Sequence, residues 1–360
     1  MQNKYKLTKL QMFSILFLIP IIITLTYSKN FFKHHSSNIW DFIISSGVSY
    51  IATFILIIPA YILYKKYPDL NLFASCRLSK LNLTVYTIYF IWASCYTVAI
   101  FRIFVLSILP YDSQIFLDTL LMFSLAVYAA FKGINAISRT SVIIAAIVFI
   151  SLFVIWTSLS SKINVINYPH FAEDGMQCAI NGSAYMVSRN FALPVFIILL
   201  PISKIKSGKV FLFWNTIIHL VFNIIILINT GALGNYLETQ IFPFYAAARV
   251  AQIGVFRRLD TIHLGFFVTG ILIVITLFFN IFIESLSNIK KTCVKNTLIV
   301  LSLFLVLVFG CFLKNSKDFN YFIYNTNLLL ILNLVTCLFL PIANLIAESS
   351  MFCKKAAGVK

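Results

Sequence analysis

Long apolar runs alternate with short polar stretches along almost the whole chain. A helix needs about 20 apolar residues to cross the hydrocarbon core of a bilayer, and ten runs are of roughly that length. An open sheet edge is not viable in lipid, and the runs are too long and uniform for barrel strands. The pattern predicts an all-α, polytopic membrane protein, with residues 1–360 forming a single transmembrane domain. The predicted spans are residues 10–28, 40–63, 82–109, 114–132, 140–160, 181–204, 210–234, 262–286, 296–314 and 324–347.

The basic residues predict how these spans are oriented. Eighteen Lys and Arg residues fall in one alternate set of loops, which includes both chain ends, and eight fall in the opposite set. Cytoplasmic loops of membrane proteins carry the excess of Lys and Arg. Both termini are therefore expected in the cytoplasm, which agrees with an even number of crossings.

Two stretches on the predicted outer side are longer than a simple turn requires, residues 161–180 and residues 235–261. The second contains a semi-apolar helix around Phe244–Phe256 and ends in Arg257, Arg258 and Asp260. It is too polar at its ends to span the membrane by itself. We expect it to lie against the outer face of the bundle, as a lid or an interfacial helix.

Composition agrees with a lipid environment and excludes a soluble domain. Apolar residues make up 60% of the 360 residues and charged residues only 11%, whereas soluble domains carry about 25% charged residues. The net charge of +17 is spread over short loops. It forms no basic helix of the kind that nucleic-acid-binding proteins use. Membrane lipid is therefore the expected environment, and no nucleic-acid partner is expected.

No metal, cofactor or catalytic arrangement stands out in the sequence. The seven cysteines form no cluster with the spacing of metal ligands, and no phosphate-binding loop is present. No nucleophile with a neighbouring base and no pair of carboxylates stands out either. The sequence predicts no metal site, no cofactor and no enzymatic activity.

Charged side chains inside the spans each need an explanation, because each costs about 3 kcal/mol on insertion scales. Arg102 in the third span and Asp118 in the fourth both lie eight residues from Pro110, at the turn between the two spans. They should lie at similar depth and form an ion pair across the hairpin. A structural ion pair that locks the bundle is the simpler interpretation, and a gate or ligand contact is the alternative.

Prolines mark two spans as interrupted helices, since proline removes a backbone donor and clashes with the preceding turn. In the sixth span Pro194 follows Arg189, and in the first span Pro20 precedes Thr24 and Thr26. Breaks in spans one and six are typical of transporters built from two inverted five-helix repeats, which hold substrate near the membrane midplane. We therefore expect this architecture, with broken helices one and six.

A further polar group lies in the middle of the seventh span. His219 has Asn215 and Asn223 four residues to either side, so that all three share one helix face. Two interpretations are open: hydrogen bonds that hold helices together, or the lining of a water-filled pathway.

Short motifs along nearly the whole chain resemble a known family in their order and spacing. They are Lys6-Leu7-Thr8 with Gln11, Tyr67-Pro68-Asp69-Leu70, Arg102 followed by Leu109-Pro110, Gly133-Ile134 with Ser138-Arg139, and Gly254-Val255-Phe256-Arg257-Arg258-Leu259-Asp260. The last block is the most specific. By these motifs the chain resembles the membrane-embedded B subunits of spore germinant receptors, the GerAB-type branch of the amino acid–polyamine–organocation superfamily.

This resemblance implies a ten-helix, transporter-like fold that serves as a nutrient sensor in the spore inner membrane. It also implies binding of a small nutrient, typically an amino acid, and assembly with a larger A subunit and a lipoprotein C subunit. Two alternatives are a secondary transporter of amino acids and a non-binding scaffold within a membrane complex. The chain departs from the family in its first span, where residues 19–24 contain no glycine.

We expect the ligand site in the interior of spans one and six, where the helix breaks are predicted. Arg189 is the candidate counter-charge for an acidic ligand group, and Tyr96, in the middle of the third span, is the candidate for closing the cavity. The other residues would supply hydroxyl and amide contacts. The expected ligand-binding residues are Thr24, Thr26, Tyr96, Ser183, Arg189 and Asn190.

Overall fold

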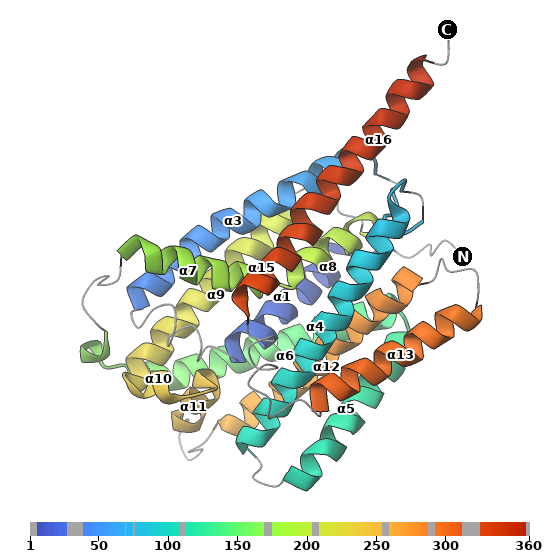
Figure 1. Ribbon diagram of the computed structural model, residues 1–360. Coiled ribbons are helices and arrows are strands. Elements are labelled where there is room, and N and C mark those ends of the chain that lie inside the picture. Colours follow the sequence, from blue (N-terminus) through green and yellow to red (C-terminus); the bar gives the residue numbers. More distant parts are fainter. Residues whose placement is uncertain are drawn as a thin grey trace.

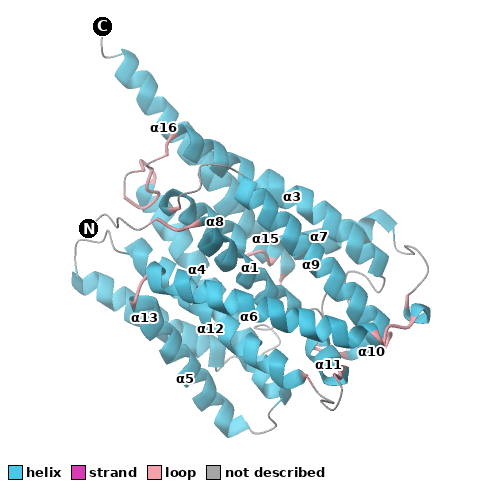
Figure 2. Cartoon of the chain, turned by 180° about the vertical axis from the view of Figure 1, so that it is seen from behind, coloured by secondary structure: helices cyan, strands magenta, loops and turns pink. Residues whose placement is uncertain are grey.

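The computed structural model of the chain describes residues 6–26, 39–68, 70–74, 76–108, 112–168, 175–203, 209–253, 259–286, 292–311 and 325–357. Within these residues the regular structure is helical, apart from one isolated parallel bridge between Leu7 and Ser203. Figures 1 and 2 show the helices packed together in one bundle. The all-α fold class predicted from the sequence is confirmed.

Helices lie in all ten predicted apolar runs. The first five runs hold α1 (Lys9–Thr26), α3 (Ile39–Lys66), α4 (Ser79–Ile108), α5 (Asp112–Phe131) and α6 (Ile134–Ser160). The sixth holds α7 (Gly175–Ser188), α8 (Ala192–Leu199) and the short 3-10 helix η2 (Leu200–Ile202). The next three hold α9 (Lys209–Leu233), α12 (Asp260–Ser285) and α13 (Thr292–Cys311). The last holds α15 (Thr326–Leu334), the π-helix η5 (Val335–Phe339) and α16 (Leu340–Ala357).

Length and hydropathy divide these helices into two groups. Six are long and apolar enough to cross a membrane: α3, α4, α6, α9, α12 and the last series from α15 into α16. The pair α7–α8 makes a seventh if it is one bent span. Over their described side chains, α1, α5 and α13 are shorter apolar helices. The protein is therefore a multi-pass membrane protein, while the count of ten crossings and the inverted repeat stay predictions.

The first helix, α1, lies inside the bundle rather than at its edge. It packs against α6, α8, α9 and α12, and Figures 1 and 2 show it among these neighbours. Its described side chains from Met12 to Ile23 are buried except Phe13. A helix that is apolar on all sides is expected at such a position.

The predicted break in span one is wrong, because α1 continues through Pro20 without interruption. Proline removes one backbone hydrogen bond, but neighbouring helices commonly hold such a helix together in a membrane. Here α12 approaches α1 closely, since a Cβ atom added to Gly270 would meet the side chain of Ile22. The close packing around α1 favours a continuous helix over a broken one.

The predicted break in span six is present. α7 ends at Ser188, α8 begins at Ala192, and the two helices are bent by 46°. Asn190 between them is non-helical, while Pro194 lies in the first turn of α8, where a missing N–H is tolerated. The sixth span therefore exposes two helix ends inside the bundle.

The last span contains a second irregularity, which the sequence analysis did not predict. Residues Val335–Phe339 are wound as a π-helix, and the N–H of Leu340 donates to the carbonyl of Val335. In this register the next bond would join Pro341 to the carbonyl of Thr336, but proline has no N–H. The Tyr86 hydroxyl of α4 donates to that carbonyl instead, over 2.9 Å.

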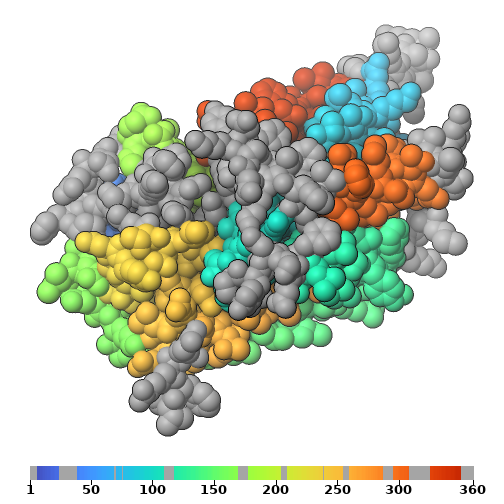
Figure 3. All heavy atoms as spheres, turned by 60° about the horizontal axis from the view of Figure 1, so that its bottom comes forward, coloured from blue at the N-terminus to red at the C-terminus, as the bar shows by residue number. Residues whose placement is uncertain are grey.

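The segment between α9 and α12, predicted to lie on the outer side, is helical in two short pieces over its described residues, α10 (Tyr236–Thr239) and α11 (Pro243–Val250). α11 is shorter than the helix predicted around Phe244–Phe256, because the backbone becomes extended at Ala251. Phe244 and the alanines of α11 are buried against the bundle, and α11 packs on α9 and α12. Figure 3 shows the yellow atoms of this part of the chain together on one surface of the molecule.

Candidate functional site

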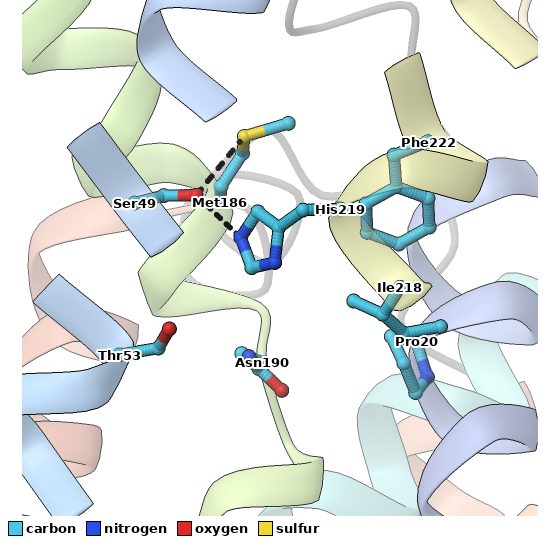
Figure 4. A pocket seen from close by; sticks show the side chains of 8 residues that line it. All are labelled: Pro20, Ser49, Thr53, Met186, Asn190, Ile218, His219 and Phe222. Atoms are coloured by element: carbon cyan, nitrogen blue, oxygen red, sulfur yellow. Dashed lines mark hydrogen bonds between the residues drawn. The ribbon is translucent and has the colours of Figure 1, made fainter. Parts of the chain in front are cut away.

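A cavity lies beside the break in the sixth span. It is enclosed by four spans: α1, α3, the sixth span and α9. Figure 4 shows the side chains around it, with Asn190 on the non-helical stretch between two helical segments. The lining residues are Pro20, Ser49, Thr53, Met186, Asn190, Ile218, His219 and Phe222.

The cavity is nearly closed in this conformation. Its volume is about 10 Å³, which is about what a single water molecule needs. A nutrient of several non-hydrogen atoms therefore requires the surrounding helices to move apart. The break in the sixth span is the element that can absorb such a movement, because it carries no continuous helical hydrogen bonding.

One wall of the cavity is a hydrogen-bonded pair between α3 and α9. Ser49 Oγ lies 2.9 Å from His219 Nε2, and His219 Nδ1 lies 2.8 Å from the carbonyl oxygen of Asn215. A carbonyl only accepts, so Nδ1 carries the hydrogen and donates. In the neutral ring Nε2 is then the acceptor, and the Ser49 hydroxyl donates to it. Both ring nitrogens are thus occupied.

A second level of the same wall lies one helical turn away. Thr53 Oγ1 donates to the Asn215 side-chain oxygen over 3.1 Å, and the Asn215 amide donates to the carbonyl of Tyr50 over 3.2 Å. The Tyr50 hydroxyl lies 3.2 Å from the Thr216 hydroxyl. Two interpretations were left open for the polar face of the seventh span. Asn215 and His219 join α9 to α3, as the first one predicts. His219 also lines the small cavity, while a water-filled pathway stays a prediction.

The opposite wall is formed by the break itself. Asn190 is only 6% exposed, yet its side-chain oxygen has no hydrogen-bond partner. An unsatisfied buried polar atom costs about 1–3 kcal/mol, so it calls for an explanation. Because Asn190 lines the cavity, its amide is available to whatever occupies that space.

The end of α7 is held from the other side by the last span. The Asn333 amide donates to the carbonyls of Val187 and Ser188, over 2.9 and 2.8 Å. Its side-chain oxygen accepts from the Tyr89 hydroxyl over 2.7 Å. These contacts satisfy two of the carbonyls that a helix leaves open at its C-terminus.

Arg189 points toward the same side as Asn333 and not into the cavity. Its guanidinium carbon lies 3.6 Å from the centre of the Tyr185 ring, a cation–π contact. One of its nitrogens donates to the hydroxyls of Ser188 and Thr326, over 3.2 and 3.5 Å. The arginine is 1% exposed and is absent from the cavity lining.

The structure brings only part of the predicted site together. Of the six expected ligand-binding residues, Asn190 lines the cavity. Ser183 is buried but its hydroxyl bonds the carbonyl of Ile180, and the ring of Tyr96 packs on Phe191. Thr24 and Thr26 belong to α1, but their side chains lie outside the described residues.

Arg102 and Asp118, the predicted ion pair, are both half-buried, in α4 and α5. Their pairing stays a prediction.

The sequence analysis missed the contribution of the second span. Ser45, Ser49 and Thr53 recur at every fourth residue of α3, and all three are buried. This spacing puts them on one face of an otherwise apolar helix. This pattern in the sequence could have indicated Ser49 and Thr53 as candidate site residues.

The geometry defines a class of protein: a multi-pass helical membrane protein with an interrupted span beside a small polar cavity. The comparison with protein families then places the chain. Residues 6–319 match the family described as spore germination protein. The chain belongs to this family, in agreement with the resemblance to GerAB-type subunits, and it is a membrane protein related to spore germination. A search of the curated proteins found no match.

Proposed function

We propose that this protein is the germinant-sensing membrane subunit of a spore nutrient receptor, and that it binds a small nutrient in the cavity beside the sixth-span break. The observation that carries the proposal is Asn190, a buried amide with an unpartnered oxygen at a helix break inside the bundle. Membership in the spore germination family supplies the biological setting.

The proposed mechanism is a shift of population between two packings of the bundle. A ligand can favour a packing only if it binds that packing more tightly than the other. The nearly closed cavity is the unliganded packing, and the nutrient stabilises one in which the sixth span has moved from α3 and α9. The change reaches the A and C subunits, which we propose as partners in the spore inner membrane, without an enzymatic step or a cofactor.

A secondary transporter of amino acids is the second candidate, because a broken span beside a central cavity is also the arrangement of many transporters. The continuous first span counts against it, since such transporters use paired breaks. The third hypothesis is a scaffold protein that binds no ligand. The buried Asn190 side-chain oxygen without a hydrogen-bond partner counts against this hypothesis.

Disruption of the gene in its own host tests the proposal. We expect spores of the disrupted strain to lose germination toward particular nutrients while growing cells keep normal nutrient uptake. Germination is followed by loss of optical density, and uptake by labelled solutes. Complementation with the intact gene is the control. Normal germination with lost uptake would show instead that the protein is a transporter.

A further inference from the structure

The described part of the cavity lining offers no counter-charge for an ionised ligand. Among the described residues that line it, none carries a formal charge, and both nitrogens of His219 are engaged. An unpaired charge buried in a low-dielectric interior is strongly unfavourable. Arg189, the cation next to Asn190 in the sequence, is held over Tyr185 and against Thr326, and it does not line the cavity.

Some of the helix-end groups that could replace charged side chains are also engaged or absent. In transporters with broken spans, free carbonyls at a half-helix end hold cations and free N–H groups hold carboxylates. Here the carbonyls of Val187 and Ser188 already accept from Asn333. The first span, which would supply the second pair of helix ends, is continuous through Pro20.

The hydrogen-bonding groups around the cavity are mostly acceptors. The Ser49 hydroxyl hydrogen is needed by His219, and the Thr53 hydroxyl donates within the bundle to Asn215 or to the carbonyl of Tyr50. Their oxygens keep a lone pair, and Asn190 adds an unpartnered carbonyl oxygen. An ionised carboxylate is an acceptor without hydrogens, so it does not complement this wall. A neutral group with N–H or O–H donors does.

From these observations we propose that the cavity binds an uncharged, hydrogen-bonding small molecule, such as a primary amide, and that Asn190 recognises it. An amide ligand donates to the Asn190 oxygen and accepts from the Asn190 NH₂ group, while Pro20 and Ile218 contact its apolar part. The inference rests on the proposed function, because it concerns the same site. It replaces the amino acid implied by the family resemblance with a neutral ligand.

Three small molecules of similar shape but different charge test which kind of ligand the cavity binds. Isobutyramide is neutral, isobutyrate is an anion, and L-alanine is a zwitterion, and they have equal numbers of non-hydrogen atoms. Each is added to the purified full-length protein, and the thermal unfolding midpoint is measured. A ligand that binds only the folded state raises this midpoint by mass action, by about 3–4 °C at roughly one hundred times Kd.

We expect isobutyramide to raise the midpoint, and isobutyrate and L-alanine to leave it unchanged. Asn190→Ala should abolish the rise, and Thr53→Val, which removes an acceptor from the other wall, should weaken it. Asn181→Ala is the matched control, since Asn181 is an exposed asparagine on α7, and it should keep the full rise. Unliganded midpoints of the variants close to the wild-type value show that they fold.

Two outcomes overturn the inference. A rise with L-alanine that depends on Asn190 shows a zwitterion site, and leaves the proposed sensor function intact. No rise with isobutyramide shows that the cavity is only a place for water. The germination assay of the disrupted strain decides the sensor function separately, because it does not depend on which ligand binds.

Discussion

At the scale of single residues, the polar side chains inside this bundle do two different jobs. Asn333 and Tyr89 hold the end of α7 with short hydrogen bonds and leave no group of their own unsatisfied. Asn190, one residue beyond Arg189 in the break, lines the cavity and has a buried oxygen without a hydrogen-bond partner. The first arrangement is structural, because every partner is internal. The second is the arrangement on which the proposed ligand site rests.

Asn333→Leu tests the structural role. Leucine has a similar shape but no amide, so the carbonyls of Val187 and Ser188 and the Tyr89 hydroxyl lose their partners. Each unsatisfied buried group costs about 1–3 kcal/mol, and we expect a clear drop in the thermal unfolding midpoint of the purified protein. Asn327→Leu, at an exposed asparagine on the same helix, should change little. Equal midpoints for the two variants would contradict the role assigned to Asn333.

At the scale of elements, the third and last spans are joined at three levels along α4. Asn82 and Asn344 exchange amide hydrogen bonds of 3.1 and 3.2 Å. One turn further on, Tyr86 donates to the carbonyl freed by the π-helix, and Tyr89 follows with its bond to Asn333. Since Asn333 also holds the end of α7, it connects the sixth-span break to the last span. Figure 1 shows that α16 extends this span beyond the other helices.

The contact between α1 and α12 gives a prediction at the same scale. Gly270→Ala places a methyl group against the fully buried side chain of Ile22, so that this side chain or the two helices must shift. Overpacking of this kind costs about 1–3 kcal/mol, so the unfolding midpoint should fall. Gly265→Ala on the same helix is the matched control, because a Cβ atom there meets nothing within 4 Å. If both variants melt alike, α1 and α12 do not pack as closely as described.

At the scale of the whole molecule, the excess of Lys and Arg in one set of loops predicts that both termini lie in the cytoplasm. A fluorescent protein fused after Lys360 should therefore fluoresce, while alkaline phosphatase fused after Asn164 should be exported and active. The fusions are compared in a bacterial host, with expression checked by immunoblot. Active phosphatase at Lys360 would reverse the orientation or make the number of crossings odd.

Sequence reasoning located the elements well and their interruptions only in part. Apolar runs predict helices reliably because backbone groups in lipid must be satisfied within the segment. Pro20 and Pro194 both predict a helix break, yet the sixth span breaks near Pro194 while α1 continues through Pro20. The difference lies in the neighbours: α1 is enclosed by close-packed apolar helices, whereas the end of α7 at the sixth-span break finds a partner in Asn333.

The residues of the candidate site were also predicted only in part. Asn190, predicted from its position in an interrupted span, lines the cavity. Arg189 beside it, also predicted, contacts Tyr185 and Thr326 and does not line the cavity. Ligand binding by either residue stays a prediction. Ser49 was overlooked, although it completes the wall with His219.

The all-α membrane fold and the approximate helix positions follow from local sequence, because each helix satisfies its own backbone and needs only about 20 apolar residues. Local sequence does not determine which polar side chains meet, because that depends on the rotation of each helix and on neighbours far away in the chain. Ser49 and His219 are 170 residues apart, and Asn333 and Val187 are 146 apart. Only the tertiary structure decided that the first pair lines a cavity while the second closes a helix end.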